Sequence, residues 1–304
     1  MMMTSGRGAS TLALAAVPPL VASGLVLTIA AVDSRLWLIQ LSAIALAALL
    51  ASLGHQVLRL SRGATAAPAI VLLTLAGVAA PLVRAGPGPH RWAAIGPLSL
   101  YLAPVLLPSF FAGFARCAAR CGRMNSIAFA AAVGVALLLA TQPDASQVLA
   151  LLAGMAIVCV RYRLDPLRSG VTLAAIGLIA AWAFSRPDPL EPVPYVEGVF
   201  ALTLAHSLAA GLAAVAGAVA LIVGLALWSS PAARWLSAVA AYYAVLFACS
   251  VAGLTPAPLI GYGAGPVLGF GLMVAVHRFD VSPFSSSLAT AARAPGRPSR
   301  RPAP

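Results

Sequence analysis

The sequence predicts an all-α membrane protein with about ten transmembrane helices and both termini in the cytoplasm. Composition is the first observation, because 61% of the 304 residues are hydrophobic and only 9% are charged, with a mean hydropathy of +0.97. No soluble core could bury that much apolar surface. The second observation is a series of apolar runs near the roughly 20 residues that a spanning helix needs, and the third is the placement of Arg along the chain.

The apolar runs divide the chain into a short leading segment, a membrane domain and a tail. We expect residues 1–10 to be cytoplasmic, 11–278 to form the polytopic domain, and 279–304 to be a disordered Arg/Pro-rich cytoplasmic tail resting on anionic lipid. The first run is longer than a signal-peptide core, so we expect an uncleaved span. The expected spans lie near residues 11–32, 36–54, 66–83, 95–115, 126–141, 146–160, 170–184, 199–228, 236–253 and 262–276.

The basic residues follow membrane topology. The net charge is +12, yet all 19 basic residues are Arg, and with the N-terminus inside, 15 of them fall in cytoplasmic segments. The other four, on the outside, are Arg35, Arg84, Arg91 and Arg186. This positive-inside bias predicts the orientation. It also accounts for the charge without a nucleic-acid partner, so we expect none.

Two extracytoplasmic segments carry polar residues of interest. HRWAAIGPL leads into the fourth expected span, and there Trp92 can be an interfacial anchor with Arg91 snorkelling beside it. QPDASQ joins the fifth and sixth spans, and there Asp144 can cap the next helix, with Gln147 at the reciprocal capping-box position. Because those two spans are short, the turn can also dip into a wet cavity, which would make Asp144 a functional carboxylate.

A third extracytoplasmic segment, GLTPAPLIGYGAGPVLGFG at 253–271, breaks an apolar stretch with Pro and Gly and places Tyr262 between two glycines. Small residues there can serve close helix packing. The density of helix breakers instead favours a re-entrant or groove-lining segment, because irregular backbone at membrane depth must be covered by protein or water.

Two other features receive structural interpretations. His206 lies within the eighth expected span, where a neutral His packed in protein is favoured over a proton relay. Cys117 and Cys121 have no partnering His or second Cys pair nearby, so we expect no metal site there.

Together the three segments resemble those of the SEDS family, the shape, elongation, division and sporulation proteins of the FtsW/RodA/SpoVE type. The family's Arg-Trp and Gly-Pro motif before the fourth span corresponds to Arg91-Trp92 with Ile95-Gly96-Pro97. Its Gln-Pro-Asp turn corresponds to residues 142–144, and its Pro-Leu-Ile-x-Tyr-Gly segment to residues 258–263. The resemblance extends from about residue 20 to 278.

The chain also departs from the family pattern. The family's Gln-Pro-Ser-Glu-x-x-Lys in the fourth span is replaced by Tyr101-Leu102-Ala103-Pro104, with Leu107 at the Lys position. The large loop before the eighth span is reduced to Arg186–Gly198. An essential Asp of the family, at the mouth of the eighth span, corresponds to Glu197 here. The resemblance therefore indicates a short and diverged member.

The resemblance implies peptidoglycan synthesis at the bacterial inner membrane, in division or elongation, by a multi-pass glycosyltransferase that polymerises lipid II. It also implies a class B penicillin-binding transpeptidase as partner. In such a reaction Glu197 would be the base for the attacking hydroxyl, and Arg or a divalent cation, Mg²⁺ or Mn²⁺, would stabilise the leaving diphosphate. The candidate substrate-binding residues are Arg91, Trp92, Asp144, Arg186 and Tyr262.

Three alternatives stay open from the sequence. Glu197 can simply be a carboxylate favoured by a helix N-terminus, which would lower its pKa, whereas burial would raise it. The chain can be a non-catalytic scaffold that binds a transpeptidase or divisome partner. It can also be a lipid flippase or transporter, although no inverted repeat of the kind common in transporters is visible.

Overall fold

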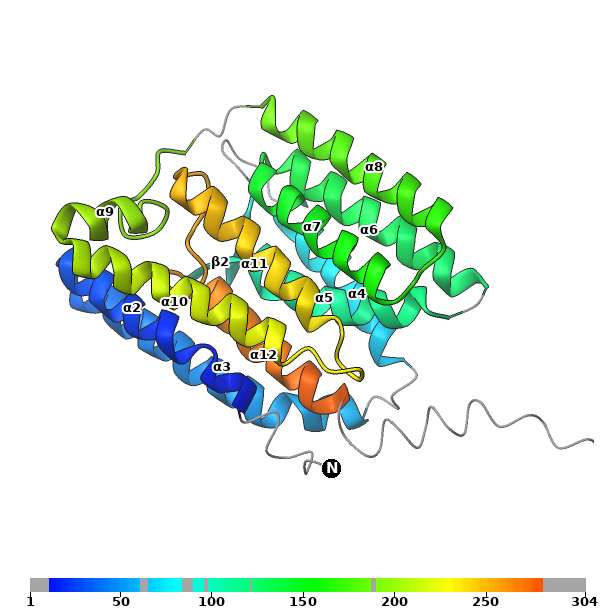
Figure 1. Cartoon of the computed structure of the whole chain (residues 1–304), viewed down its shortest axis with the longest axis horizontal. Helices are drawn as coiled ribbons and strands as arrows, with labels where there is room; N and C mark the ends of the chain where they lie inside the picture. Colours follow the sequence, from blue (N-terminus) through cyan, green and yellow to red (C-terminus); the bar gives the residue numbers. More distant parts are fainter. Residues whose placement is uncertain are drawn as a thin grey trace, which may run out of the picture.

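The computed structural model describes residues 11–60, 65–83, 90–95, 98–120, 122–186 and 190–280 (Figure 1). The expected cytoplasmic segment 1–10 and nearly all of the expected tail therefore lie outside the described residues. The helices and strands are α2 (Val17–Ile29), α3 (Ser34–Leu60), α4 (Ala66–Ala79), η1 (Ala80–Val83), β1 (Trp92–Ile95), β2 (Leu98–Tyr101), α5 (Ala103–Ala118), α6 (Arg123–Thr141), α7 (Ala145–Arg161), α8 (Pro166–Phe184), α9 (Val199–His206), α10 (Leu208–Leu227), α11 (Leu236–Val251) and α12 (Ala264–Asp280).

The long apolar helices lie on the outside of the bundle. Among the described residues, six helical stretches are long and apolar enough to cross a membrane, namely Thr11–Ile29, which contains α2, Ala66–Val83, which joins α4 and η1, and the helices α3, α6, α8 and α10. Less than half of each is buried, and large apolar side chains such as Leu38 and Leu178 are exposed at 66% and 74%. Such a surface fits lipid and not water. The chain is thus a multi-pass α-helical membrane protein, while the count of ten spans stays a prediction.

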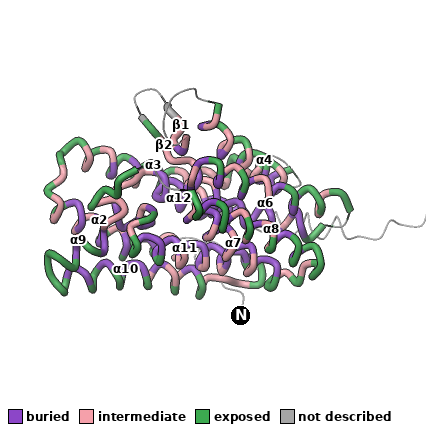
Figure 2. Tube along the Cα trace, turned by 90° about the horizontal axis from the view of Figure 1, so that it is seen from above, coloured by how far each residue is buried: buried purple, intermediate pink, exposed green. Residues whose placement is uncertain are grey.

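Shorter helices form the interior. In Figure 1, α11 and α12 lie between a flank of α2, α3 and α10 and a flank of α6 and α8, and Figure 2 shows buried residues concentrated toward the middle. Helix α5 packs against α4 and α12, and α11 packs against α7. Phe110, Phe111 and Tyr242 are fully buried between them. Most of the surface of these helices is covered by protein, so they need less length and less hydropathy than lipid-facing helices.

Two expected spans differ in the structure. The expected fourth span, 95–115, begins with an antiparallel hairpin that pairs Trp92 with Tyr101, so helix α5 starts only at Ala103. The Gly-Pro pair at 96–97 explains the difference, because it favours a turn over a helix. Within the described ranges, the fold is therefore all-α except for this two-stranded sheet.

The expected eighth span, 199–228, is broken into α9 and α10. Ser207 has extended backbone angles, and its hydroxyl accepts a hydrogen bond from the Ala210 N–H, so it caps α10. Helix α9 packs against α10. His206 is exposed at this break, so the interpretation of a packed His inside a span is wrong.

The connections fall into two groups at opposite ends of the bundle. At one end, Arg168 donates to Asn125 at 2.7 Å and Arg234 donates to the Arg161 carbonyl at 3.3 Å. At the other end lie the hairpin, the turn at 142–144, the loop before α9 and the connection between α11 and α12. The Arg distribution predicts that the connections at the first end are cytoplasmic and that those at the other end are extracytoplasmic.

Candidate functional site

Arg91 fastens the hairpin to the turn between α6 and α7. Its Nε donates to the Gln142 carbonyl at 2.9 Å, and a terminal guanidinium nitrogen donates to the Pro143 carbonyl. The side chain is only 8% exposed, so it does not snorkel as an isolated neighbour of Trp92. Trp92 packs its ring against Tyr101, with centroids 6.0 Å apart. Arg91 and Trp92 therefore belong to one packed cluster.

Asp144 receives the Tyr101 hydroxyl. It is 3% exposed and occupies the N-cap position of α7, yet its side chain makes no capping hydrogen bond. The Tyr101 hydroxyl instead donates to its Oδ2, and Gln147 accepts a hydrogen bond from the Tyr242 hydroxyl at 2.7 Å. The predicted capping box is therefore wrong, because both side chains turn toward the protein interior.

The same cluster has unusual electrostatics. Burial raises the pKa of the Tyr101 phenol well above its usual value, the Asp144 charge raises this pKa further, and the Arg91 guanidinium opposes the rise. The phenol is thus kept protonated and remains a hydrogen-bond donor. The structure joins Arg91, Trp92 and Asp144 through Tyr101, a residue that the sequence offered only as a departure from the family pattern.

The connection between α11 and α12, residues 252–263, is irregular and largely buried. The Ala257 N–H donates to the Val196 carbonyl at 3.1 Å, and the Tyr262 N–H donates to the Tyr195 carbonyl at 2.8 Å. The backbone groups thus find partners in the loop before α9. This agrees with the prediction that protein covers an irregular segment, although its depth in a membrane stays a prediction.

Tyr262 stands beside Tyr195. Their ring centroids are 6.3 Å apart in an edge-on arrangement. Burial raises the pKa of the Tyr262 phenol, Tyr195 adds to the rise, and Arg35 opposes it. Tyr262 is half-buried, and its contact with Tyr195 holds it beside the loop that carries Glu197.

Glu197 closes a tight turn at the mouth of α9. Its Oε2 accepts a hydrogen bond from the Val193 N–H at 2.8 Å, while its own N–H donates to the Val193 carbonyl at 2.9 Å. The residue is half-buried and directly precedes Gly198, the N-cap of α9. Its carbonyl accepts from the Ser250 hydroxyl at 3.3 Å. The carboxylate is therefore held in place by the backbone.

Arg186 lies at the end of α8 and reaches the neighbouring helix. One guanidinium nitrogen donates to the Ala140 carbonyl at 3.0 Å, and the guanidinium carbon lies 5.2 Å from the Trp182 ring centroid. Ala140 is close in sequence to the turn that holds Asp144. Arg186 is exposed, so it is the more accessible of the two outside Arg candidates.

The connection at 252–263 links these clusters. The Ser146 hydroxyl, two residues beyond Asp144, donates to the Leu254 carbonyl at 3.4 Å. A Cβ on Gly265, just after the connection, would lie 2.7 Å from the Tyr101 carbonyl oxygen. The three predicted segments and the Glu197 turn thus meet at one end of the bundle.

Sequence reasoning missed Gln40, a buried polar side chain on α3. Its Oε1 accepts from the Gly263 N–H at 3.2 Å, and its Nε2 donates to the Ser23 hydroxyl at 3.4 Å. Ser23 in turn donates to the Gly261 carbonyl at 3.4 Å. Two polar residues inside otherwise apolar runs were the available signal. They secure the glycines that flank Tyr262.

The described residues offer no cluster of side-chain ligands for a resident metal ion. Across the ranges that the structure describes, no three His, Cys, Asp or Glu residues gather as metal ligands. Asp144 already accepts the Tyr101 hydroxyl, and an all-protein Mg²⁺ or Mn²⁺ site would need several oxygen ligands.

No family model and no curated protein sequence matches the chain. Among solved structures, the rod shape determining protein RodA of Thermus thermophilus is 22% identical, with a TM-score of 0.65 over 88% of this chain and 95% of that chain. A chain from a peptidoglycan synthase complex, described by its coordination of polymerization and crosslinking, is 21% identical, with a TM-score of 0.67 over 88% of this chain and 97% of that chain. The chain therefore has the fold of RodA, the SEDS fold to which its three sequence motifs also point.

Proposed function

We propose that this protein is a SEDS-type peptidoglycan glycosyltransferase of the bacterial inner membrane that polymerises lipid II beside a class B penicillin-binding transpeptidase. One observation carries the proposal: a RodA-like fold gathers all three motif segments around the turn that holds Glu197. The neighbour from a peptidoglycan synthase complex supports a transpeptidase partner. The same site could serve peptidoglycan synthesis in cell division or in cell elongation.

In the proposed reaction, a sugar hydroxyl oxygen attacks the anomeric carbon of a second lipid-linked sugar. The new glycosidic bond forms as the bond to undecaprenyl diphosphate breaks. Glu197 accepts the hydroxyl proton, and the leaving diphosphate takes away the electron pair. The hydrogen bond from the Val193 N–H fixes one carboxylate oxygen, which orients the base.

The remaining candidate residues take different parts in this proposal. Arg186, exposed beside the site, is suited to the diphosphate because guanidinium groups bind phosphate oxygens in a fixed fork. Arg91 is bound to two backbone carbonyls and instead positions the turn that carries Asp144. Trp92 and Tyr262 are half-buried aromatic residues that can contact the substrate. A Mg²⁺ or Mn²⁺ ion would enter with the diphosphate, which supplies its own oxygen ligands.

Glu197→Gln tests the proposal. The purified chain, with a transpeptidase partner and labelled lipid II, should lose strand synthesis by about 100- to 10,000-fold, the usual contribution of a base. The amide oxygen can still accept from the Val193 N–H, so the loop should keep its shape. Glu197→Asp should keep partial activity. Wild-type strand lengths on a gel with Glu197→Gln would remove Glu197 from the mechanism.

Glu191→Gln is the matched control. Glu191 lies on the same loop and is exposed, so its substitution removes the same charge without touching the turn at Glu197. Strand synthesis by this variant should stay within about twofold of wild type, as is usual for an exposed surface change.

A second candidate function, a non-catalytic scaffold, is favoured by α5. Leu107, at the position of the family's Lys, is fully buried, so this helix offers no charge to a substrate there. A scaffold would bind the transpeptidase yet make no strands. Co-purification of the partner with wild-type protein that is inactive in the gel assay would support this second function over the first.

A further inference from the structure

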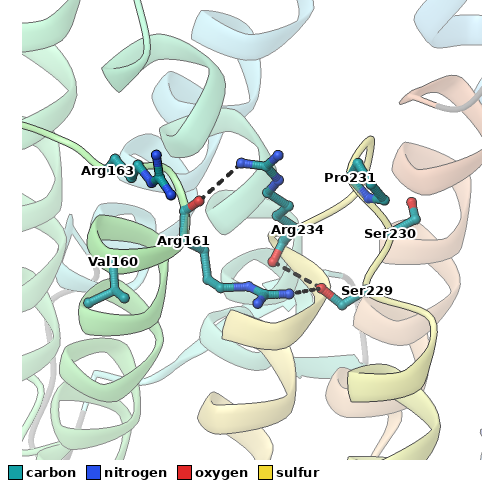
Figure 3. A pocket seen from close by; sticks show the side chains of 7 residues that line it. All are labelled: Val160, Arg161, Arg163, Ser229, Ser230, Pro231 and Arg234. Carbon is teal, nitrogen blue, oxygen red and sulfur yellow. Dashed lines mark hydrogen bonds between the residues drawn. The ribbon is translucent and has the colours of Figure 1, made fainter.

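A basic pocket lies at the end of the bundle opposite the Glu197 turn. It has a volume of about 690 Å³ and is lined by the end of α7 and by the connection between α10 and α11. Figure 3 shows the guanidinium groups of Arg163 and Arg234 on one side of the Arg161 backbone, and the Arg161 guanidinium on the other side with Ser229. All three Arg side chains line the same hollow.

The charge of this pocket is not neutralised by its own lining, which includes no acidic residue. Two acids lie near the lining residues, Asp165 along the chain and Asp280 through its hydrogen bond from Trp235, and both have other partners. Asp165 accepts from the Arg168 N–H as the N-cap of α8, and Asp280 pairs with Arg116 at 2.5 Å. The pocket thus keeps a net positive charge that favours an anion.

The pocket also has hydrogen-bond donors to offer. Within the described part of the chain, the Arg163 guanidinium donates no hydrogen bond, and Arg161 and Arg234 make only long ones, at 3.4 Å to the Ser229 hydroxyl and 3.3 Å to the Arg161 carbonyl. Guanidinium groups bind phosphoryl oxygens in pairs of parallel hydrogen bonds. The Ser229 hydroxyl already donates to the Arg234 carbonyl at 3.4 Å, so the guanidinium groups are the main donors for a ligand.

Exposed apolar side chains lie close along the chain to the residues that line the pocket. Val160 lines the pocket and is 74% exposed. Leu167, at the start of α8, is 74% exposed, and Leu227, the last residue of α10, is 79% exposed. These residues lie at or near helix ends, where in the predicted topology lipid headgroups would meet acyl chains. A phospholipid could place its phosphate among the Arg residues and its acyl chains against Val160 and the neighbouring exposed leucines, which a free phosphate ion would leave bare.

We propose that this pocket binds the phosphoryl headgroup of an anionic phospholipid in the leaflet opposite the candidate active site. In the predicted topology this is the cytoplasmic leaflet, whose anionic lipids attract basic residues near the membrane surface. The ligand chemistry is a phosphate monoester or diester. The exposed apolar side chains of Val160, Leu167 and Leu227 favour a lipid over free phosphate as its source.

Native mass spectrometry of the full chain in neutral detergent tests the proposal, with phosphatidylglycerol and phosphatidylcholine as probes. Phosphatidylglycerol should bind more tightly than phosphatidylcholine, and Arg163→Gln/Arg234→Gln should weaken its binding by about tenfold or more. Arg163→Gln alone should weaken it in part without removing any hydrogen bond inside the described protein. An unchanged thermal midpoint would show that these variants stay folded.

Arg120→Gln/Arg123→Gln is the charge-matched control at the same end of the bundle, outside the pocket. It should change phosphatidylglycerol binding by less than about twofold. Equal losses in the two double variants would overturn the proposal, because they would indicate general attraction by charge. Binding of inorganic phosphate that needs Arg163 and Arg234, with lipid binding that does not, would overturn the lipid as the source.

Discussion

Tyr101 and Asp144 illustrate the site at the scale of single residues. The phenol and the carboxylate come from segments 43 residues apart, and Asp144 is 3% exposed. Tyr101→Phe should lower stability by about 1 to 3 kcal/mol, since a buried charged group loses a donor and cannot turn to water. Thermal unfolding in detergent measures the loss.

Tyr195→Phe serves as the comparison for that substitution. The Tyr195 hydroxyl makes no hydrogen bond within the described residues, and the side chain is half-buried. Its removal should shift the thermal midpoint little. If both variants melt together with wild type, the Tyr101 hydroxyl does not stabilise Asp144.

Residues of this cluster could be identified from the sequence, but the contacts between them could not. Asp144 and Arg91 stand out because charged residues are rare in the chain. Tyr101 does not, since an aromatic residue near a membrane surface usually needs no partner. The capping box was predicted from local spacing, and it failed because Tyr101, brought near by the hairpin, competes for the carboxylate. Contacts across the fold are not encoded in local spacing.

At the scale of elements, α12 packs against its neighbours backbone to backbone. A Cβ on Gly269 would lie 2.0 Å from the Pro104 carbonyl oxygen on α5, and one on Gly271 would lie 2.4 Å from the Ala47 carbonyl oxygen on α3. Small residues permit this approach between helices that lipid cannot drive together by hydrophobicity.

Gly269→Ala should therefore destabilise the protein, by about 1 to 3 kcal/mol if the helices can shift apart. Gly170→Ala on α8 is the matched control, because nothing lies within 4 Å of its would-be Cβ, and alanine favours the helix by up to about 1 kcal/mol. Thermal midpoints in detergent should fall for the first and hold or rise for the second. The reverse order would contradict the close contact between α5 and α12.

The positions of most helices could be predicted from the apolar runs, since a lipid-facing helix must be continuously apolar. The break between α9 and α10 could not. A single Ser207 within an apolar run is compatible with an unbroken helix, and only the packing of α9 on α10 selects the capped, extended conformation. The hairpin before α5 was missed for a similar reason, because its short strands are as apolar as the span they precede.

At the scale of the whole molecule, the two groups of connections give a test of orientation. Alkaline phosphatase fused after residues 144 and 192 should be active, as expected in the periplasm. Fusions after residues 123, 165 and 234 should be inactive, and a fluorescent protein that folds only in the cytoplasm should light up there instead. The reason is the excess of Arg in the connections that contain residues 123, 165 and 234. An active phosphatase after residue 165 would invert the topology and place the Glu197 turn in the cytoplasm.

The ion pair at the end of α12 has a mechanical consequence. Asp280 is 8% exposed, pairs with Arg116 of α5 and accepts a hydrogen bond from the Trp235 ring at 2.9 Å. It is also the last residue before the Arg-rich stretch at 281–304. A force applied to the chain beyond Asp280 would act on the contacts of Asp280 with Arg116 and Trp235. Helix α5 would then transmit this force from Arg116 toward its other end, where Tyr101 donates to Asp144.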